Sequence, residues 1–376
     1  MHSVKGFVPM SRFCPAPWIN ISTDVNGSIR PCCRYEQPIR QIEYKMPWMK
    51  DGTLDQVYNS PEMNKLRNAF RNGVEPKECS WCWKEEKSGI KSFREKYIER
   101  NYIYDENNPV PQIYDLKLSN VCNLKCRMCG PQASSSIAKE EGVSNEYWLE
   151  NKIIGTENED IFFNEWLPSM QELELTGGEP FFSPENKQLI ERIVDSGHAD
   201  HINILITTNA MFYLPKLMEK LSSFKRVAIS LSIDDIGARL EYARAGAKWD
   251  LIQKNITSIL EKYPTFNTSI YRTINNYNIF YLNELDDWAL ENNVKVSNGI
   301  LHEPKHLSIQ NLPKWAKEEV TERFIRSNKY KNILDFMNID NTNEIQSFRN
   351  TTLEKDNVRK QSFKESFPEW GEILLW

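Results

Sequence analysis

Three cysteines in one short segment are the residues of this sequence best suited to chemistry. Cys122, Cys126 and Cys129 follow the spacing C-x3-C-x2-C, and no fourth cysteine lies nearby. Iron–sulfur clusters are normally held by four cysteine thiolates, so three would leave one iron open to another group. A zinc loop completed by a distant histidine or cysteine is the alternative. The triplet therefore predicts a metal site, and it favours an iron–sulfur cluster over zinc.

Five further cysteines lie in the first quarter of the chain, at positions 14, 32, 33, 79 and 82. In an exported protein, eight cysteines would suggest disulfides. Residues 1–17 lack the continuous apolar stretch of a signal peptide, so we expect a cytoplasmic location with reduced thiols. Two separate thiolate sites are the simplest account of the eight cysteines.

A second motif, Thr176-Gly-Gly-Glu-Pro180, could take part in the same chemistry. Its paired glycines would let the backbone approach a ligand closely, and Glu179 can accept a hydrogen bond from an ammonium group. On its own the motif would be an ordinary turn between a strand and a helix. The segments 207–209 and 230–234 also carry short polar groups at expected strand ends, where parallel barrels assemble their active sites.

The elements that position these motifs follow from the hydrophobic pattern. After residue 112, apolar strands alternate with helical segments, which predicts a parallel sheet. The expected strands are 113–118, 172–175, 202–207, 226–233, 266–274 and 294–299, and the expected helices include 186–194, 249–262 and 281–291. Pro109 and Pro111 favour a linker at 105–112. We therefore expect an N-terminal domain (1–104), the linker, an α/β domain (113–304) and a partly helical C-terminal extension (305–376).

The N-terminal domain has its own local signals. Residues 18–32 alternate like a strand pair around Asn26-Gly27, which predicts a hairpin. Ser60-Pro61 is typical of the first turn of a helix, and Gly73 can end that helix. Cys79 and Cys82 follow directly, so the hairpin and the helix would bring the early cysteines together.

The two motifs of the α/β domain, taken together, resemble those of the radical S-adenosylmethionine (SAM) superfamily. The resemblance implies a partial (β/α)6 barrel whose three cysteines hold a 4Fe-4S cluster, with SAM chelating the open iron. It implies that SAM contacts come from Met128, Gly177, Gly178, Glu179, Pro180, Thr208, Asn209, Ser232, Asp234, Arg244 and Asn275.

Four of these residues carry specific expectations from the resemblance. Glu179 would meet the methionine amino group, and Arg244 the methionine carboxylate, a role suited to its fixed donor fork. Met128 would pack near the adenine, and Asn275 would reach the adenosine. A surface ion pair is the alternative for Arg244, and ordinary core packing is the alternative for Met128.

The early cysteines resemble the hairpin core of the SPASM and twitch auxiliary-cluster domains. There, a cysteine precedes a Gly-x4-Cys hairpin and a C-x2-C pair follows a helix, as in Gly27-x4-Cys32 and Cys79-x2-Cys82. The domain usually follows the barrel, whereas here it precedes it, as in N-terminal-twitch radical SAM proteins. The resemblance implies an auxiliary 4Fe-4S cluster, and four ligands suffice. The chosen ligands are Cys14, Cys32, Cys79 and Cys82, and Cys33 is a possible substitute, a neighbouring residue or a hydrogen-atom donor. Zinc is again the alternative.

The activity that the resemblance implies is reductive cleavage of SAM to a 5′-deoxyadenosyl radical, which abstracts a substrate hydrogen. An auxiliary cluster that accepts the remaining electron would make the reaction a net oxidation. The substrate would be a peptide, a sugar or another small metabolite, and flavodoxin or ferredoxin would be the reductant. The alternative is a non-catalytic, zinc-stabilised binding module on a degenerate barrel.

Net charge and hydropathy argue against two classes of partner, nucleic acids and membranes. The formal charge of −5 and the scattered Lys and Arg residues give no basic face for nucleic acid. No apolar run has membrane-spanning length, so we expect no membrane partner. His302 and His306 are expected to be surface or capping residues, and the aromatic tail from Phe367 is expected to cover the barrel opening or to bury apolar surface.

Overall fold

The computed structural model describes residues 12–25, 29–36, 58–144, 153–155, 158–339 and 343–374. An eight-stranded sheet runs through the described part of the chain in the order β10-β9-β7-β6-β5-β3-β1-β2. Its strands are β1 (Asn20–Thr23), β2 (Ile29–Arg30), β3 (Ile113–Leu116), β5 (Glu172–Leu175), β6 (Asn203–Thr208), β7 (Arg226–Leu231), β9 (Asn267–Ile274) and β10 (Lys295–Ile300). A short antiparallel ribbon joins β4 (Lys125–Cys126) to β8 (Arg244–Ala245).

The sheet from β3 to β10 is parallel throughout and open, as a partial barrel requires. All six predicted strands are present, and the α/β class with a partial barrel is confirmed. In β6, Ile204 and Ile206 are buried, whereas Leu205 and Thr207 are only half-buried. One face of the sheet therefore packs against helices, and the other face is more accessible.

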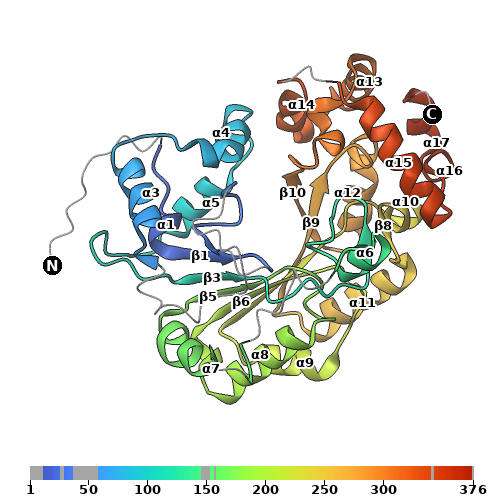
Figure 1. Cartoon of the computed structure of the whole chain (residues 1–376). Coiled ribbons are helices and arrows are strands. Elements are labelled where there is room, and N and C mark those ends of the chain that lie inside the picture. Colours follow the sequence, from blue (N-terminus) through green and yellow to red (C-terminus); the bar gives the residue numbers. More distant parts are fainter. Residues whose placement is uncertain are drawn as a thin grey trace.

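Helices from the strand–helix units cover the apolar face of the sheet (Figure 1). They are α8 (Pro184–Asp195), α9 (Pro215–Leu221) and α11 (Trp249–Lys262). The remaining helical segments between strands are α6 (Ser135–Glu140), α7 (Asn158–Ile161), the π-helical turn η3 (Phe162–Trp166), η4 (Leu167–Ser169), η5 (Ala199–His201), α10 (Gly237–Ala243), η6 (Ile279–Tyr281) and α12 (Leu282–Glu291). The predicted helices at 186–194, 249–262 and 281–291 correspond to α8, α11 and α12.

The N-terminal part contains α1 (Ala16–Ile19), the β1–β2 pair, α3 (Pro61–Arg71), η1 (Lys77–Cys79), α4 (Ser80–Lys87) and α5 (Phe93–Arg100). β1 and β2 pair antiparallel, as the predicted hairpin requires, while its Asn26-Gly27 turn lies outside the described residues. Trp18 and Ile19 belong to α1 rather than to the predicted strand, because prolines on both sides of Ala16 favour a helical turn. The predicted helix is α3, and the Ser60 hydroxyl accepts a hydrogen bond from Met63 N at 3.4 Å.

The N-terminal part and the barrel share one sheet, which the sequence did not predict. β1 pairs in parallel with β3, with Asn20 opposite Ile113. Arg100 on α5 forms ion pairs with Glu172 and Glu174 on β5, each at 2.8 Å. The end of the expected linker is already paired, since Gln112 N donates to Ile19 O at 2.7 Å. The early cysteines are thereby fixed relative to the barrel strands.

The C-terminal part is helical from residue 305, in agreement with the expected extension. It contains η7 (Lys305–Leu307), η8 (Ile309–Asn311), α13 (Lys314–Phe324), η9 (Asn328–Tyr330), α14 (Lys331–Met337), α15 (Ile345–Arg359), α16 (Phe363–Ser366) and α17 (Pro368–Ile373). Phe367 and Trp370 are fully buried, and the Trp370 ring stacks on Phe280 at 5.0 Å. The aromatic tail therefore docks onto the barrel and buries apolar surface. In the described ranges, no helix has both the length and the apolarity needed to cross a membrane.

Candidate functional site

The loop after β3 brings the three closely spaced cysteines together. Cys126 lies in the β4–β8 ribbon, and Cys129 N donates to Cys126 O at 3.1 Å, which turns the loop back on itself. A hydrogen bond from the Cys129 thiol lowers the pKa of Cys126 to about 7, against the effect of burial. Burial raises the pKa of Cys122 to about 12. These are free thiols, and a bound metal would favour the thiolate form of each.

Arg244 stands beside the cysteine loop. Its Nε and Nη2 atoms donate to Asp234 Oδ2 at 2.8 and 2.7 Å, and its Nη1 atom lies 3.7 Å from Cys126 Sγ. Asp234 Oδ1 in turn accepts from Thr273 N at 2.8 Å. Arg244 is only 9% exposed, so the alternative of a surface ion pair is wrong. The arrangement holds a guanidinium group next to the thiols, where it favours negative charge.

The Gly-Gly-Glu-Pro turn lies directly against the start of the cysteine loop. Gly178 N donates to Ser119 O at 3.0 Å, and Glu179 N donates to Val121 O at 2.8 Å. A Cβ atom on Gly178 would lie 2.3 Å from Val121 O, and Gly177 has a φ of +103°. We expected the glycines to admit a ligand. In the described residues they admit the backbone of the cysteine loop, which no larger residue would allow.

Glu179 is almost fully buried and joins this turn to the end of β6. Its two carboxylate oxygens accept from Phe181 N at 3.0 Å, Thr208 Oγ1 at 2.7 Å and Asn209 N at 2.7 Å. Burial raises the pKa of Glu179 to about 7, although these hydrogen bonds oppose the effect. A carboxylate has about four acceptor positions, so these bonds leave capacity for one further donor. Asn209 also donates to Asn123 Oδ1 in the cysteine loop, at 2.9 Å.

The other residues predicted to contact SAM differ in how far they are buried. Ser232 is half-buried, and its N–H donates to Thr208 O at 2.7 Å. Met128 is half-buried and packs against both large hydrophobic clusters of the molecule, and Pro180 is buried beside Glu179. Asn275 is fully buried, and its amide holds the turn after β9 by bonding to Thr273 O and Tyr277 N, each at 2.9 Å. The contact between Asn275 and adenosine stays a prediction.

The early cysteines form a second group. Cys14, Cys32, Cys79 and Cys82 line one small cavity, together with Arg34, Phe70, Arg94 and Tyr97. Cys33 is not among the lining residues. Burial raises its pKa to about 12, and the neighbouring Asp115 of β3 acts in the same direction. The four lining cysteines are the ones predicted as auxiliary ligands, and Cys33 faces the sheet instead.

Two ionic clamps that the sequence analysis missed hold the cysteine loop to the C-terminal helices. In the first, Arg127 Nη2 donates to Asp356 Oδ1 on α15 at 2.5 Å, and the Arg127 guanidinium lies 3.7 Å from the centre of the Tyr242 ring. In the second, Arg359 Nη2 and Lys125 Nζ bind Glu140 at 2.7 and 2.6 Å.

Burial alone would raise the pKa of Glu140, but the hydrogen bonds from Arg359 and Lys125 lower it to about 2. An arginine inside the cysteine motif was the only available sequence signal for the first clamp, because its partner lies more than 200 residues away.

His302 corrects another expectation. Its side chain is 6% exposed rather than on the surface, and its Nε2 lies 3.2 Å from Glu85 Oε1 on α4. Its ring stacks on Trp81 at 5.2 Å. His306 is half-buried. The segment after β10 thus packs against the helix that carries Cys82, and this contact links the N-terminal and C-terminal parts.

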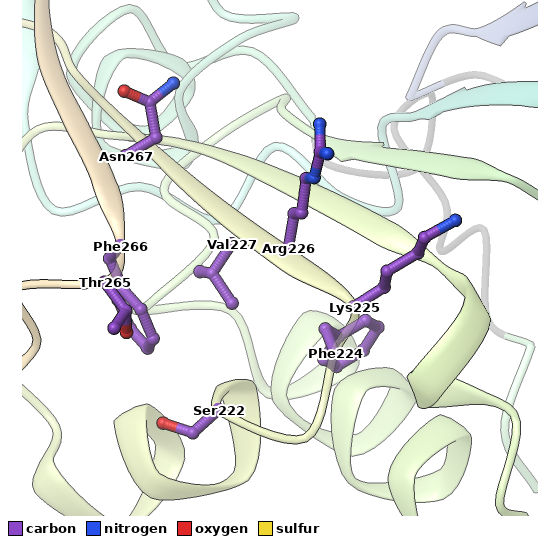
Figure 2. A pocket seen from close by; sticks show the side chains of 8 residues that line it. All are labelled: Ser222, Phe224, Lys225, Arg226, Val227, Thr265, Phe266 and Asn267. Carbon is purple, nitrogen blue, oxygen red and sulfur yellow. The ribbon is translucent and has the colours of Figure 1, made fainter.

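A separate hollow of about 400 Å3 lies at the opposite end of the strands (Figure 2). It is formed where β7 and β9 begin, around Phe224, Val227 and Phe266. Parallel barrels place their chemistry at the carboxyl ends of the strands. The hollow is therefore not part of the candidate site.

Comparison with known families agrees with both cysteine groups. A model described as "Radical SAM superfamily" matches residues 116–289, which include the cysteine loop, the Gly-Gly-Glu-Pro turn and Arg244. Residues 116–289 thus match a radical SAM domain. A model of the SPASM domain, described as an iron-sulfur cluster-binding domain, matches residues 14–83. The cofactors follow: a 4Fe-4S cluster with SAM for the radical SAM domain, and a further iron–sulfur cluster for the N-terminal SPASM domain.

Among solved structures, this chain is similar to native anSMEcpe with bound AdoMet, at 15% identity and a TM-score of 0.42, over 57% of this chain and 59% of that one. It is also similar to Streptococcus suis SuiB bound to S-adenosylmethionine, at 18% identity and 0.39, over 56% and 47%. SuiB bound to its precursor peptide SuiA matches at 14% and 0.35, over 88% and 59%. The chain thus spans less than two thirds of each. None of the curated proteins matches this sequence.

Proposed function

We propose that this chain is an enzyme that uses SAM as a source of the 5′-deoxyadenosyl radical to abstract a hydrogen atom from its substrate. The observation that carries the proposal is the convergence of two separate segments on one loop. The Gly178–Glu179 turn bonds to its start, Arg244 reaches Cys126, and three cysteines lie within it. When bound, the cluster and SAM supply the radical chemistry, and the protein supplies ligands, orientation and exclusion of water.

The residues have distinct roles in this proposal. Cys122, Cys126 and Cys129 hold the cluster and leave one iron for SAM. Arg244, fixed by Asp234, binds the methionine carboxylate with the donor that Asp234 leaves free. Glu179 accepts from the methionine amino group with its remaining capacity.

The auxiliary cluster belongs to the N-terminal part, which we propose extends to residue 104, ahead of a barrel at 113–304 and an extension from 305. Its ligands are Cys14, Cys32, Cys79 and Cys82, which line one cavity. We propose that this cluster accepts the electron left on the substrate, so that the reaction is a net oxidation. The substrate is a peptide, a sugar or another small metabolite, and flavodoxin or ferredoxin in the cytoplasm reduces the enzyme.

The test is a comparison of variants of the anaerobically reconstituted chain. We expect about eight irons per chain for the wild type and formation of 5′-deoxyadenosine with dithionite and SAM. Cys126→Ala should lose this activity. Cys79→Ala should still form 5′-deoxyadenosine but yield no oxidised product, and unchanged product formation would overturn the electron-acceptor role.

The neighbouring cysteines provide a matched control for the ligand assignment. Cys32→Ala should lose about four irons, whereas Cys33→Ala should retain them. The reverse result would exchange the two assignments.

The alternative function is a zinc-stabilised binding module. Within the described residues, no three Cys, His, Asp or Glu side chains are grouped closely enough to hold one metal ion. Purified chain that contains zinc without iron would favour the alternative.

A further inference from the structure

Two cationic side chains meet where the N-terminal part faces the sheet. Arg34 follows the auxiliary cysteine segment, and Lys96 lies on α5. The guanidinium carbon of Arg34 and the ammonium nitrogen of Lys96 lie 4.7 and 4.6 Å from the centre of the Phe93 ring. Lys96 is also 5.9 Å from the centre of the Tyr271 ring on β9. The two charges therefore share one aromatic wall between the auxiliary cysteines and the barrel.

The two cations lack carboxylate partners among the described residues. Across the ranges that the structure describes, no carboxylate forms an ion pair with Arg34 or Lys96. The Glu85 carboxylate raises the pKa of both Arg34 and Lys96 through its charge, but it forms no ion pair with either. Its Oε1 atom instead lies 3.2 Å from His302 Nε2. By contrast, the nearby Arg94 is paired with a carboxylate at 2.6 Å. Both side chains are half-buried, and holding two like charges side by side in partial burial costs free energy unless an anion joins them.

The phenol of Tyr271 completes the group. Its hydroxyl oxygen is buried and lies next to Arg34, which can only donate to it, and no described residue accepts the phenol proton. A Cβ atom on Gly299 would lie 2.1 Å from this oxygen, so the neighbouring strand leaves room for the phenol only because residue 299 is glycine. A buried hydroxyl whose proton has no acceptor is costly, and it is ready to donate to a ligand.

The auxiliary cluster does not account for the whole arrangement. Arg34 also lines the cavity of the four auxiliary cysteines, so it can balance thiolate charge there. Lys96 and Tyr271 do not line that cavity. Burial lowers the pKa of Lys96, and the positive charge of Arg34 lowers it further, so an anion placed between the two side chains would favour the charged ammonium group.

We propose that Arg34, Lys96 and Tyr271 bind an anionic oxygen group of the substrate, a carboxylate or a phosphate, and hold it between the two cysteine groups. This inference rests on the proposed function and names a property of its substrate. A guanidinium fork, an ammonium group and a phenol hydroxyl are donors that suit anionic oxygens.

The experiment measures how anions protect Lys96 in the reconstituted holoprotein. Lysines are labelled anaerobically by reductive methylation in inorganic phosphate, in succinate or in chloride at equal ionic strength, and the modified sites are quantified by mass spectrometry. We expect at least about threefold slower labelling of Lys96 with one or both oxyanions than with chloride. Lys314, whose side chain is 89% exposed, is the internal control and should be labelled equally in all three.

Protection by phosphate alone assigns a phosphate group, protection by succinate alone assigns a carboxylate, and protection by both supports the shared anion site. Arg34→Gln should abolish the protection, and Tyr271→Phe, which removes only the hydroxyl, should weaken it. Absence of protection by either oxyanion, or full protection in Arg34→Gln, would overturn the proposal.

The experiments distinguish a failure of the proposed function from a failure of the proposed anion site. If wild-type protein forms no 5′-deoxyadenosine but phosphate or succinate still protects Lys96, the anion site stands and the radical function does not. If 5′-deoxyadenosine forms and neither anion protects Lys96, the function stands and the anion site does not.

Discussion

Replacement of Asp356 by alanine tests how the C-terminal helices hold the cysteine loop. Asp356 Oδ1 accepts from Arg127 Nη2 at 2.5 Å and from Tyr242 Oη at 2.7 Å, and its Oδ2 accepts from Phe363 N at 2.8 Å. The Arg127 side chain is 0% exposed and that of Asp356 is 8% exposed. The substitution would therefore leave a buried guanidinium group without its anion and would leave two further donors without an acceptor.

Breaking a buried ion pair on one side costs about 3–5 kcal/mol of unfolding free energy. Arg127 keeps bonds to Tyr242 O and Thr352 O at 3.2 and 3.4 Å, so we expect the lower end, about 3 kcal/mol. Urea unfolding of the wild type and of Asp356→Ala measures the difference. The matched control is Asp335→Ala, which breaks an exposed pair with Lys331 and should cost less than about 1 kcal/mol.

A paired substitution separates the charge effect from the effect of packing. Arg127→Met combined with Asp356→Leu removes both charges and should recover most of the lost stability, because apolar replacements of a buried pair are often neutral. A loss below about 1 kcal/mol in Asp356→Ala would refute the clamp. So would a loss equal to that of Asp335→Ala.

Three further predictions concern the same loop. Gly178→Ala would place a Cβ atom 2.3 Å from Val121 O; we expect a loss of about 2–3 kcal/mol in urea unfolding, and a loss under 0.5 kcal/mol would contradict this close approach. In the folded state the pKa of Glu140 is about 2, which is below its value in the unfolded chain. The contribution of Glu140 to the unfolding free energy is therefore complete above about pH 5 and is lost as the pH falls to about 2. Because Glu140 is only partly buried, solvent screens part of this effect, so Glu140→Gln should reduce the loss of unfolding free energy at acid pH by about 1–2 kcal/mol, and an unchanged pH dependence would disprove it. Arg244→Lys replaces the planar fork of separate donor nitrogens with one ammonium nitrogen, so equilibrium binding of SAM should weaken about tenfold; an unchanged Kd would exclude the role.

The strands and the motifs could be predicted because their signals are local. The segment that forms β6 contains the apolar run Ile204-Leu205-Ile206, which is a local signal for a strand. The cysteine spacing and the Gly-Gly-Glu-Pro turn are each contained in a few residues. The family match to residues 116–289 agrees with the predicted α/β region.

The features that the sequence did not predict depend on contacts between segments that lie far apart in the chain. β1 is buried at all four positions, because β2 and β3 flank it and it joins the barrel sheet, and no local pattern announces a partner about 90 residues away. The Arg127–Asp356 clamp and the His302–Glu85 contact each cross more than 200 residues. The close approach of Gly178 to Val121 O was missed for the same reason, since that backbone belongs to the loop after a different strand, and the contact of the glycines with SAM stays a prediction.

The account depends on an open iron position at Cys122, Cys126 and Cys129 that SAM occupies directly. Electron–nuclear double resonance of the reduced protein with SAM labelled by 15N at its amino group and 17O at its carboxylate tests this most directly. We expect hyperfine coupling of both labels to the cluster in the wild type and none in Cys126→Ala. Absence of coupling in wild-type protein that carries its full iron content would contradict the account.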